Sequence, residues 1–141
     1  MGLDLGERRI GIAVSDDAGS LVLPVGHVDR SRRLKDDIEA VLNIAQERRV
    51  EGLVIGMPYH ISGDVGVQAK RAQGFVRALR KRTELPVFTV DEGYTSVEAE
   101  ALLREAGNQP SRNRGAVDAL AAVLILRRFL DQQTAPGDAG A

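Results

Sequence analysis

The sequence predicts an α/β fold in which helices flank a mixed five-stranded sheet. Three observations support this: the chain opens with a pair of alternating strands, two short apolar runs follow between helix-length segments, and a long apolar helix ends the pattern. Strands that are connected through helices pair in parallel, whereas the opening pair is an antiparallel hairpin. One sheet therefore contains both kinds of pairing.

The first three strands come from the start of the chain. Residues 2–5 and 8–15 form the predicted hairpin, with a turn centred on Gly6, and apolar residues alternate with small or polar ones in its second strand. Residues 20–28 supply a third strand. Pro24 either weakens this strand or places it at an edge of the sheet, because proline lacks the backbone N–H that an inner strand donates.

Helices and strands alternate along the rest of the chain. Apolar residues recur every three or four positions in the helices, and the strands are short continuous apolar runs. Thr95 and Glu98 have the spacing of a capping box, so a helix begins near 96, and Gly107 ends it. The other predicted helices span 31–49, 67–83 and 114–131, and the other strands span 52–56 and 86–90.

We expect a single domain over residues 1–131. The segment 57–68 contains a proline and glycines and has no periodicity, which is typical of a mobile loop, and a lid over a site is its functional interpretation. Residues 132–141 continue none of the patterns and are predicted to form a disordered C-terminal tail.

Composition excludes several classes of protein. The chain contains no cysteine, and its apolar runs are shorter than the roughly 20 residues of a membrane span. We therefore expect a soluble cytoplasmic protein with no disulfide bond and no membrane partner. The net charge of −1 is not typical of a nucleic-acid binder, but basic residues gather locally, as in RSRRLK over 30–35.

Asp118 is the one charged residue in the apolar run AVDALAAVLIL, residues 116–126. An unpaired carboxylate is strongly disfavoured in an apolar interior, and two interpretations avoid that cost. In the first, Asp118 is partly exposed near the start of its helix. Its charge interacts favourably with the helix dipole there and stabilises the helix by at most ~1 kcal/mol. In the second, other acids converge on it at a functional site.

Two other segments place acids where they can meet Asp118. Asp4 lies between two leucines, so it faces the opposite side of its strand, where its neighbours are glycines. Asp91 and Glu92 directly follow the last predicted strand, at the carboxyl end where α/β sheets bind ligands. Adjacent side chains point apart, so one of these two faces the site. The alternative is that both only complement a helix dipole.

Three carboxylates from separate segments repel one another unless cations lie between them. Mg²⁺ and Mn²⁺ prefer hard oxygen ligands, and two such ions can activate a water and stabilise the leaving oxygen of a phosphodiester. The acids therefore predict a two-metal nuclease. The two histidines show no ligand spacing, so we do not expect a zinc site.

Four motifs together resemble the YqgF/RuvX family of nucleases with an RNase H-like fold. They are LDLGERRIGIAVSD (3–16), VIGMP with the later Gly63 (54–63), DEGYTSVEAEALL (91–103) and VDALAAVLIL (117–126). By this resemblance Asp4, Glu92 and Asp118 are the catalytic acids and metal ligands, so Glu92 is preferred to Asp91. The family is described as maturing the 5′ end of pre-16S ribosomal RNA and, in some bacteria, as resolving Holliday junctions. The resemblance therefore implies a four-way DNA junction or pre-16S rRNA as the partner.

The chain departs from the family's pattern in two places. Where the family commonly has Asp-Glu-Arg-Leu-Thr, this sequence has DEGYT, so Gly93 replaces a basic residue beside Glu92. This predicts the loss of a phosphate contact or of a nearby charge. The chain also begins three residues before Asp4, so we expect a short first strand.

Two pairs of arginines are predicted to bind phosphates of a nucleic acid. Arg8 and Arg9 lie at the hairpin turn next to Asp4, and Arg112 and Arg114 precede the helix of Asp118. Ordinary exposed arginines are the alternative for both pairs.

Other side chains have less specific interpretations. Tyr59 and His60 are either a stacking pair for a splayed base or an ordinary exposed pair. Lys70, Arg77 and Lys81 face away from the apolar side of their helix, which is typical of a solvated surface.

Two other functions fit part of the sequence. The first motif also resembles the phosphate-binding hairpin of actin-like and sugar-kinase ATPases, but those enzymes need two such domains, and 141 residues are too few. A non-catalytic nucleic-acid-binding or ribosome-assembly factor is the second alternative. Resolving a two-fold junction requires two sites, so we expect a homodimer, for which Leu102, Leu103 and Phe129 are either interface or core.

Overall fold

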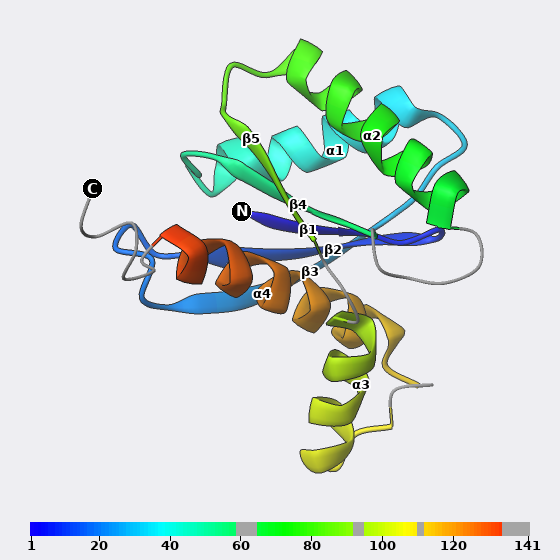
Figure 1. The fold of residues 1–141 in the computed structure, drawn as a ribbon, viewed down its shortest axis with the longest axis vertical. Helices are drawn as coiled ribbons and strands as arrows, with labels where there is room; N and C mark the ends of the chain where they lie inside the picture. Colours follow the sequence, from blue (N-terminus) through cyan, green and yellow to red (C-terminus); the bar gives the residue numbers. More distant parts are fainter. Residues whose placement is uncertain (59–64, 92–94, 110–111, 134–141) are drawn as a thin grey trace.

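The computed structural model describes residues 1–58, 65–91, 95–109 and 112–133 (Figure 1). Strands and helices in this part of the chain follow the predicted order. The strands are β1 (Gly2–Leu5), β2 (Arg9–Ser15), β3 (Val22–Asp29), β4 (Leu53–Met57) and β5 (Val87–Asp91). The helices are α1 (Leu34–Glu47), α2 (Val65–Arg82), α3 (Thr95–Glu105) and α4 (Arg114–Gln133). None of these helices is long and apolar enough to cross a membrane.

The strands form one mixed sheet in the order β3-β2-β1-β4-β5. β2 pairs antiparallel with both β1 and β3, whereas β4 pairs parallel with both β1 and β5. The predicted fold class is therefore confirmed. β3 is an edge strand, as Pro24 predicts, and the β2–β3 register shifts between Ile12 and Ala13, the residue opposite Pro24.

Helices cover both faces of the sheet (Figure 1). α1 and α2 lie over one face, and the core on this side contains large, fully buried side chains such as Leu3, Phe75 and Leu79. α4 crosses the other face, where its small residue Ala122 packs with the strands, while Ala121 packs with Ala99 of α3, the helix that lies against α4. Small side chains let α4 approach the strands closely, and this close approach positions the candidate site.

α1 begins later than the predicted residue 31. The Ser31 hydroxyl bonds both the backbone N–H and the carbonyl of Arg33, and the Ser31 backbone N–H donates to the Asp37 carboxylate over 2.7 Å. Arg33, the N-cap residue, has an extended backbone with φ −114° and ψ 115°. These local bonds compete with helix formation, so the first helical turn starts only at Leu34.

Two other boundaries also shift. The predicted loop 57–68 is shorter at both ends, and its residues 59–64, including the predicted stacking pair, lie outside the described residues. α4 continues to Gln133, two residues past the predicted end of the domain. The rest of the predicted tail, 134–141, lies outside the described residues.

Candidate active site

Asp4 faces α4 from the first strand. Its neighbours Leu3 and Leu5 pack into the core under α1 and α2, so the alternation of the strand turns Asp4 to the opposite face, as predicted. Asp4 is only 6% exposed. A carboxylate this buried needs partners for its charge, and a bound cation with hard-acid character would supply one.

Gly11 brings α4 next to Asp4. It lies opposite Asp4 in the antiparallel register of β1 and β2. A Cβ atom built on Gly11 would lie 1.9 Å from the Asp118 carbonyl oxygen, so no side chain fits between β2 and α4 at this point. Gly2 repeats the arrangement further along β1, where a Cβ atom would lie 2.8 Å from the Ala122 carbonyl oxygen. These glycines, which sequence reasoning did not single out for this role, place Asp118 directly beside the strand that carries Asp4.

Asp118 forms an ion pair with Arg9. The Arg9 Nε donates to Asp118 Oδ2 over 2.5 Å, and the two side chains are 27% and 17% exposed. Arg9 belongs to the same face of β2 as Gly11, because both occupy odd positions of the strand. The pair orients the Asp118 carboxylate and balances its charge, which answers why an acid is tolerated in an apolar helix.

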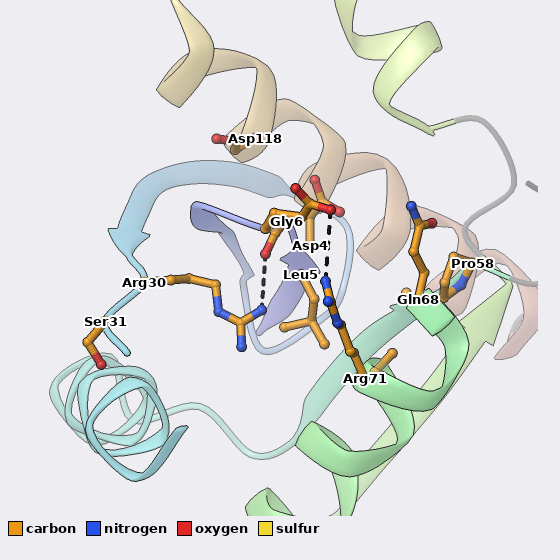
Figure 2. A pocket seen from close by; sticks show the side chains of 12 residues that line it. Asp4, Leu5, Gly6, Arg30, Ser31, Pro58, Gln68, Arg71 and Asp118 are labelled. Atoms are coloured by element: carbon orange, nitrogen blue, oxygen red, sulfur yellow. Dashed lines mark hydrogen bonds and ion pairs between the residues drawn. The ribbon is translucent and has the colours of Figure 1, made fainter. Parts of the chain in front are cut away.

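Asp4 and Asp118 line one cavity of about 500 Å³ (Figure 2). The cavity lies at the carboxyl ends of β1 and β4, where Gly6 and Pro58 contribute to its wall. Figure 2 shows Asp118 on the α4 side of the cavity and Arg30 on the opposite side, with the end of β1 between them. This is the edge of an α/β sheet at which ligands bind.

The third predicted acid, Glu92, lies outside the described residues. Its neighbour Asp91 is the last residue of β5, and the Asp91 carbonyl oxygen accepts a hydrogen bond from Arg128 over 2.5 Å. β5 runs parallel to β4, so its carboxyl end belongs to the edge that carries the cavity. Within the described ranges no three His, Cys, Asp or Glu side chains cluster as a metal site. Asp4 and Asp118 on the cavity wall offer the hard oxygen donors that Mg²⁺ or Mn²⁺ requires, and Glu7 lines the same cavity.

The other predicted phosphate-binding arginines are exposed and are not part of the cavity lining. Arg8 and Arg112 are exposed. Arg114 donates to Glu100 of α3 over 2.8 Å, which ties the start of α4 to α3. Arg9 differs from these three because its side chain is held on Asp118.

Arg30 and Arg71 also line the cavity, and sequence reasoning did not single them out. Arg30 directly follows the edge strand β3, and its backbone N–H donates to the Arg8 carbonyl over 2.8 Å, beside the hairpin turn. Arg71 lies near the start of α2, the helix that follows β4. Arg30 carried a signal in the sequence, since it directly follows a strand, whereas Arg71, inside α2, carried none.

The remaining predicted residues lie away from the cavity lining. Lys70, Arg77 and Lys81 are exposed on α2, in agreement with a solvated surface. Leu102 is 43% exposed on α3, and Phe129 packs on Phe88 with ring centroids 4.9 Å apart.

Known proteins resemble this chain over nearly its whole length. Residues 1–132 match RuvX, a family described as Holliday junction resolvase. A protein of Synechococcus sp. is 46% identical over 136 residues, which cover 96% of this chain and 91% of that protein. A protein of Trichormus variabilis is 41% identical over 131 residues, which cover 93% and 86%. Both carry the name "Putative pre-16S rRNA nuclease".

The fold matches a solved structure of RuvC. The structure of T. thermophilus RuvC in complex with Holliday junction substrate aligns with 95% of this chain and 94% of that chain, with a TM-score of 0.59 and 17% sequence identity. At this identity the likeness concerns the fold alone. It confirms the RNase H-like fold that the resemblance implies.

Proposed function

Because the chain belongs to the RuvX family of Holliday junction resolvases and is a nuclease of that family, we propose that Asp4, Glu92 and Asp118 hold divalent cations that drive phosphodiester hydrolysis. One observation carries the proposal: Asp4 and Asp118 come from opposite ends of the sequence and line the same cavity at the carboxyl edge of the sheet. Glu92 is the residue after β5 in the sequence, and the carboxyl end of β5 belongs to that edge. Mg²⁺ or Mn²⁺ would lower the pKa of a bound water and stabilise charge on the scissile phosphate.

The protein's own contribution is a rigid set of carboxylates. Asp4 is buried on a strand in the middle of the sheet, and Asp118 is held beside it by the Gly11 contact and by Arg9. Two carboxylates on one cavity attract divalent cations and repel a phosphate, so bound cations strengthen the binding of a substrate phosphate beside the acids. The exposed Arg8, next to the cavity residue Glu7 in the sequence, and the exposed Arg112, which precedes α4, would offset this repulsion and steer a nucleic acid toward the cavity.

The 5′ end of pre-16S rRNA is the first candidate substrate. The two relatives of Synechococcus sp. and Trichormus variabilis that carry this name are 46% and 41% identical to this chain over nearly its whole length. A four-way DNA junction is the second candidate, favoured by the family description and by the fold shared with RuvC bound to a junction. The second substrate requires a homodimer with two sites on opposed strands. The absence of cysteine fits a reducing compartment and supports the predicted cytoplasmic location.

The carboxylate proposal is tested with charge-neutral variants. Asp4→Asn, Glu92→Gln and Asp118→Asn are each expected to lower the cleavage rate at least about a hundredfold in Mg²⁺ or Mn²⁺, because each removes a ligand charge. Asp17→Asn is the matched control, since Asp17 is exposed at the other end of the sheet. If the three variants cleave as fast as this control, the proposed site is wrong.

The substrate is decided by a side-by-side assay. A 5′-extended 16S precursor transcript and a synthetic four-way junction are incubated with the protein and the metal, and the mass of the protein in solution is measured. Cleavage of the transcript at its 5′ extension supports the first candidate. Paired cuts on opposite strands of the junction by a dimer would support the second instead, and cleavage of neither would favour a non-catalytic binding factor.

A further inference from the structure

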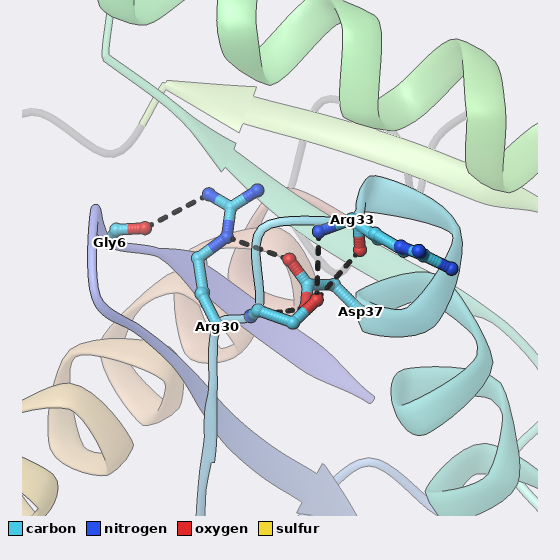
Figure 3. A network of polar contacts seen from close by, with 5 residues as sticks. Gly6, Arg30, Arg33 and Asp37 are labelled. Atoms are coloured by element: carbon cyan, nitrogen blue, oxygen red, sulfur yellow. Dashed lines mark hydrogen bonds and ion pairs between the residues drawn. The ribbon is translucent and has the colours of Figure 1, made fainter.

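Arg30, which lines the cavity, is fixed by three contacts, and Figure 3 shows those with Asp37 and Gly6. Its Nε lies 3.4 Å from Oδ2 of Asp37, and one of its terminal nitrogens donates to the Gly6 carbonyl over 3.0 Å. The guanidinium carbon lies 5.7 Å from the centroid of the Phe75 ring, which is fully buried. An arginine held on two sides and stacked on an aromatic ring has lost most of its rotamer freedom.

Asp37 explains why Arg30 stays in this position. Asp37 is only 3% exposed, and its carboxylate also accepts the Ser31 backbone N–H over 2.7 Å. A buried carboxylate needs a cation, and among the described residues Arg30 is the cation that lies against it. The pair therefore holds Arg30 in place before any ligand arrives.

The position of Arg30 links it to the candidate acids. The Gly6 carbonyl belongs to the turn between β1, which carries Asp4, and β2, which carries Arg9. Arg30 and Asp4 line the same cavity. In Figure 2 the guanidinium of Arg30 lies next to this turn, on the side away from Asp118.

Arg30 has N–H donors that its bonds to Asp37 and Gly6 do not use. An arginine carries more donors than the bonds to Asp37 and Gly6 use, and its side chain remains 23% exposed. Arg71, also on the cavity wall, lies 3.9 Å from Glu7, and both of those side chains are more than two-thirds exposed. Such an exposed ion pair is not held in one geometry, whereas Arg30 is held in place before a ligand binds.

We infer that Arg30 is a preorganised phosphate-binding residue, which contacts the nucleic-acid backbone at a phosphate next to the scissile one. The inference takes its ligand class from the proposed function and adds a residue to that site. A fixed guanidinium binds a phosphate oxygen at a small cost in side-chain entropy, and its charge offsets the repulsion between the phosphates and the acids of the cavity. Arg30 touches the substrate away from the reacting atoms, so its effect is on binding and register.

The test measures binding without cleavage. The labelled 16S precursor transcript and the labelled four-way junction are titrated with the protein in EDTA at several salt concentrations. Arg30→Gln is expected to raise Kd about tenfold and to reduce the slope of log Kd against log salt by about one, because one phosphate contact is lost. Arg48→Gln is the matched control, since Arg48 is an exposed arginine at the opposite end of the sheet. If Arg30→Gln binds with the Kd and the salt slope of this control, the inference is wrong.

A second variant separates binding from folding. Arg30→Lys keeps the positive charge beside Asp37 but lacks the fork that reaches Asp37, Gly6 and a phosphate together. We expect it to melt near the parent's temperature and to bind with a raised Kd and a nearly unchanged salt slope. Binding equal to the parent's would overturn the inference even if Arg30→Gln does not fold. Because these titrations need no hydrolysis, an inactive parent protein would count against the nuclease proposal alone.

Discussion

Replacing Gly11 with alanine should separate α4 from the sheet at the candidate site. The new Cβ would lie 1.9 Å from the Asp118 carbonyl oxygen, and ordinary contacts begin at 3.4 Å, so the helix or the strand must move by about 1.5 Å. The obstacle is backbone, which no side-chain rotation can relieve. We expect a loss of at least about 3 kcal/mol in the free energy of unfolding, the upper part of the range for overpacked cores. A shift of this size also moves Asp118 relative to Asp4, and misplacements of about 1 Å cost about a hundredfold in rate.

Denaturant unfolding measures the loss of stability. The loss of rate is measured separately, with whichever of the 16S precursor and the four-way junction the parent cleaves faster. Gly74→Ala is the control, because Gly74 lies within α2 and a Cβ there meets only the far end of the Arg77 side chain, 3.9 Å away. That variant should be unchanged or more stable by up to about 1 kcal/mol, since alanine is the better helix former. Parent-like stability and cleavage by Gly11→Ala would refute the close-contact reasoning.

Two further predictions concern other parts of the molecule. The Leu21 backbone N–H and the Ser20 hydroxyl, which donate to Asp16, lower the pKa of its carboxyl below the usual 3.8. The stabilisation by Asp16 is therefore full above that value and is lost as the pH falls through the folded pKa. The difference in Tm between the parent and Asp16→Asn should shrink in acid, and a pH-independent difference would contradict this account. Leu79→Ala, in the core under α1 and α2, should cost about 2–5 kcal/mol of unfolding free energy. Cleavage by its folded fraction at 25 °C should stay near the parent's, because α4 does not move, and a large loss of rate would show that the two faces of the sheet are coupled.

Local patterns in the sequence predicted most of the fold. Periods of two and of three to four residues located the strands and helices, and Pro24 identified the edge strand. The start of α1 was wrong by three residues, because the bond between the Ser31 N–H and Asp37 is invisible to periodicity. The facing direction of Asp4 was also predictable, since it follows from alternation along one strand.

The candidate site was only partly predictable, because local patterns do not show which distant side chains meet. Asp4 and Asp118 were identified from their unusual surroundings in the sequence, and the structure places both on one cavity. The roles of two arginines were not predicted: Arg9 was expected to bind phosphate and is found on Asp118, and Arg30, found on Asp37, was only one of several basic residues in a run.

The sequence by itself therefore determined the order of the elements, the mixed sheet and the acids that interrupt apolar patterns, because each of these depends on neighbours a few positions away. Only the tertiary structure decided how closely α4 lies on β2 at Gly11 and which arginines the acids hold. Contacts between segments more than a hundred residues apart, such as Arg9 with Asp118, depend on how helices pack on a sheet to within an ångström or two. No local propensity encodes that distance, since it results from the shapes of all the side chains that share the interface.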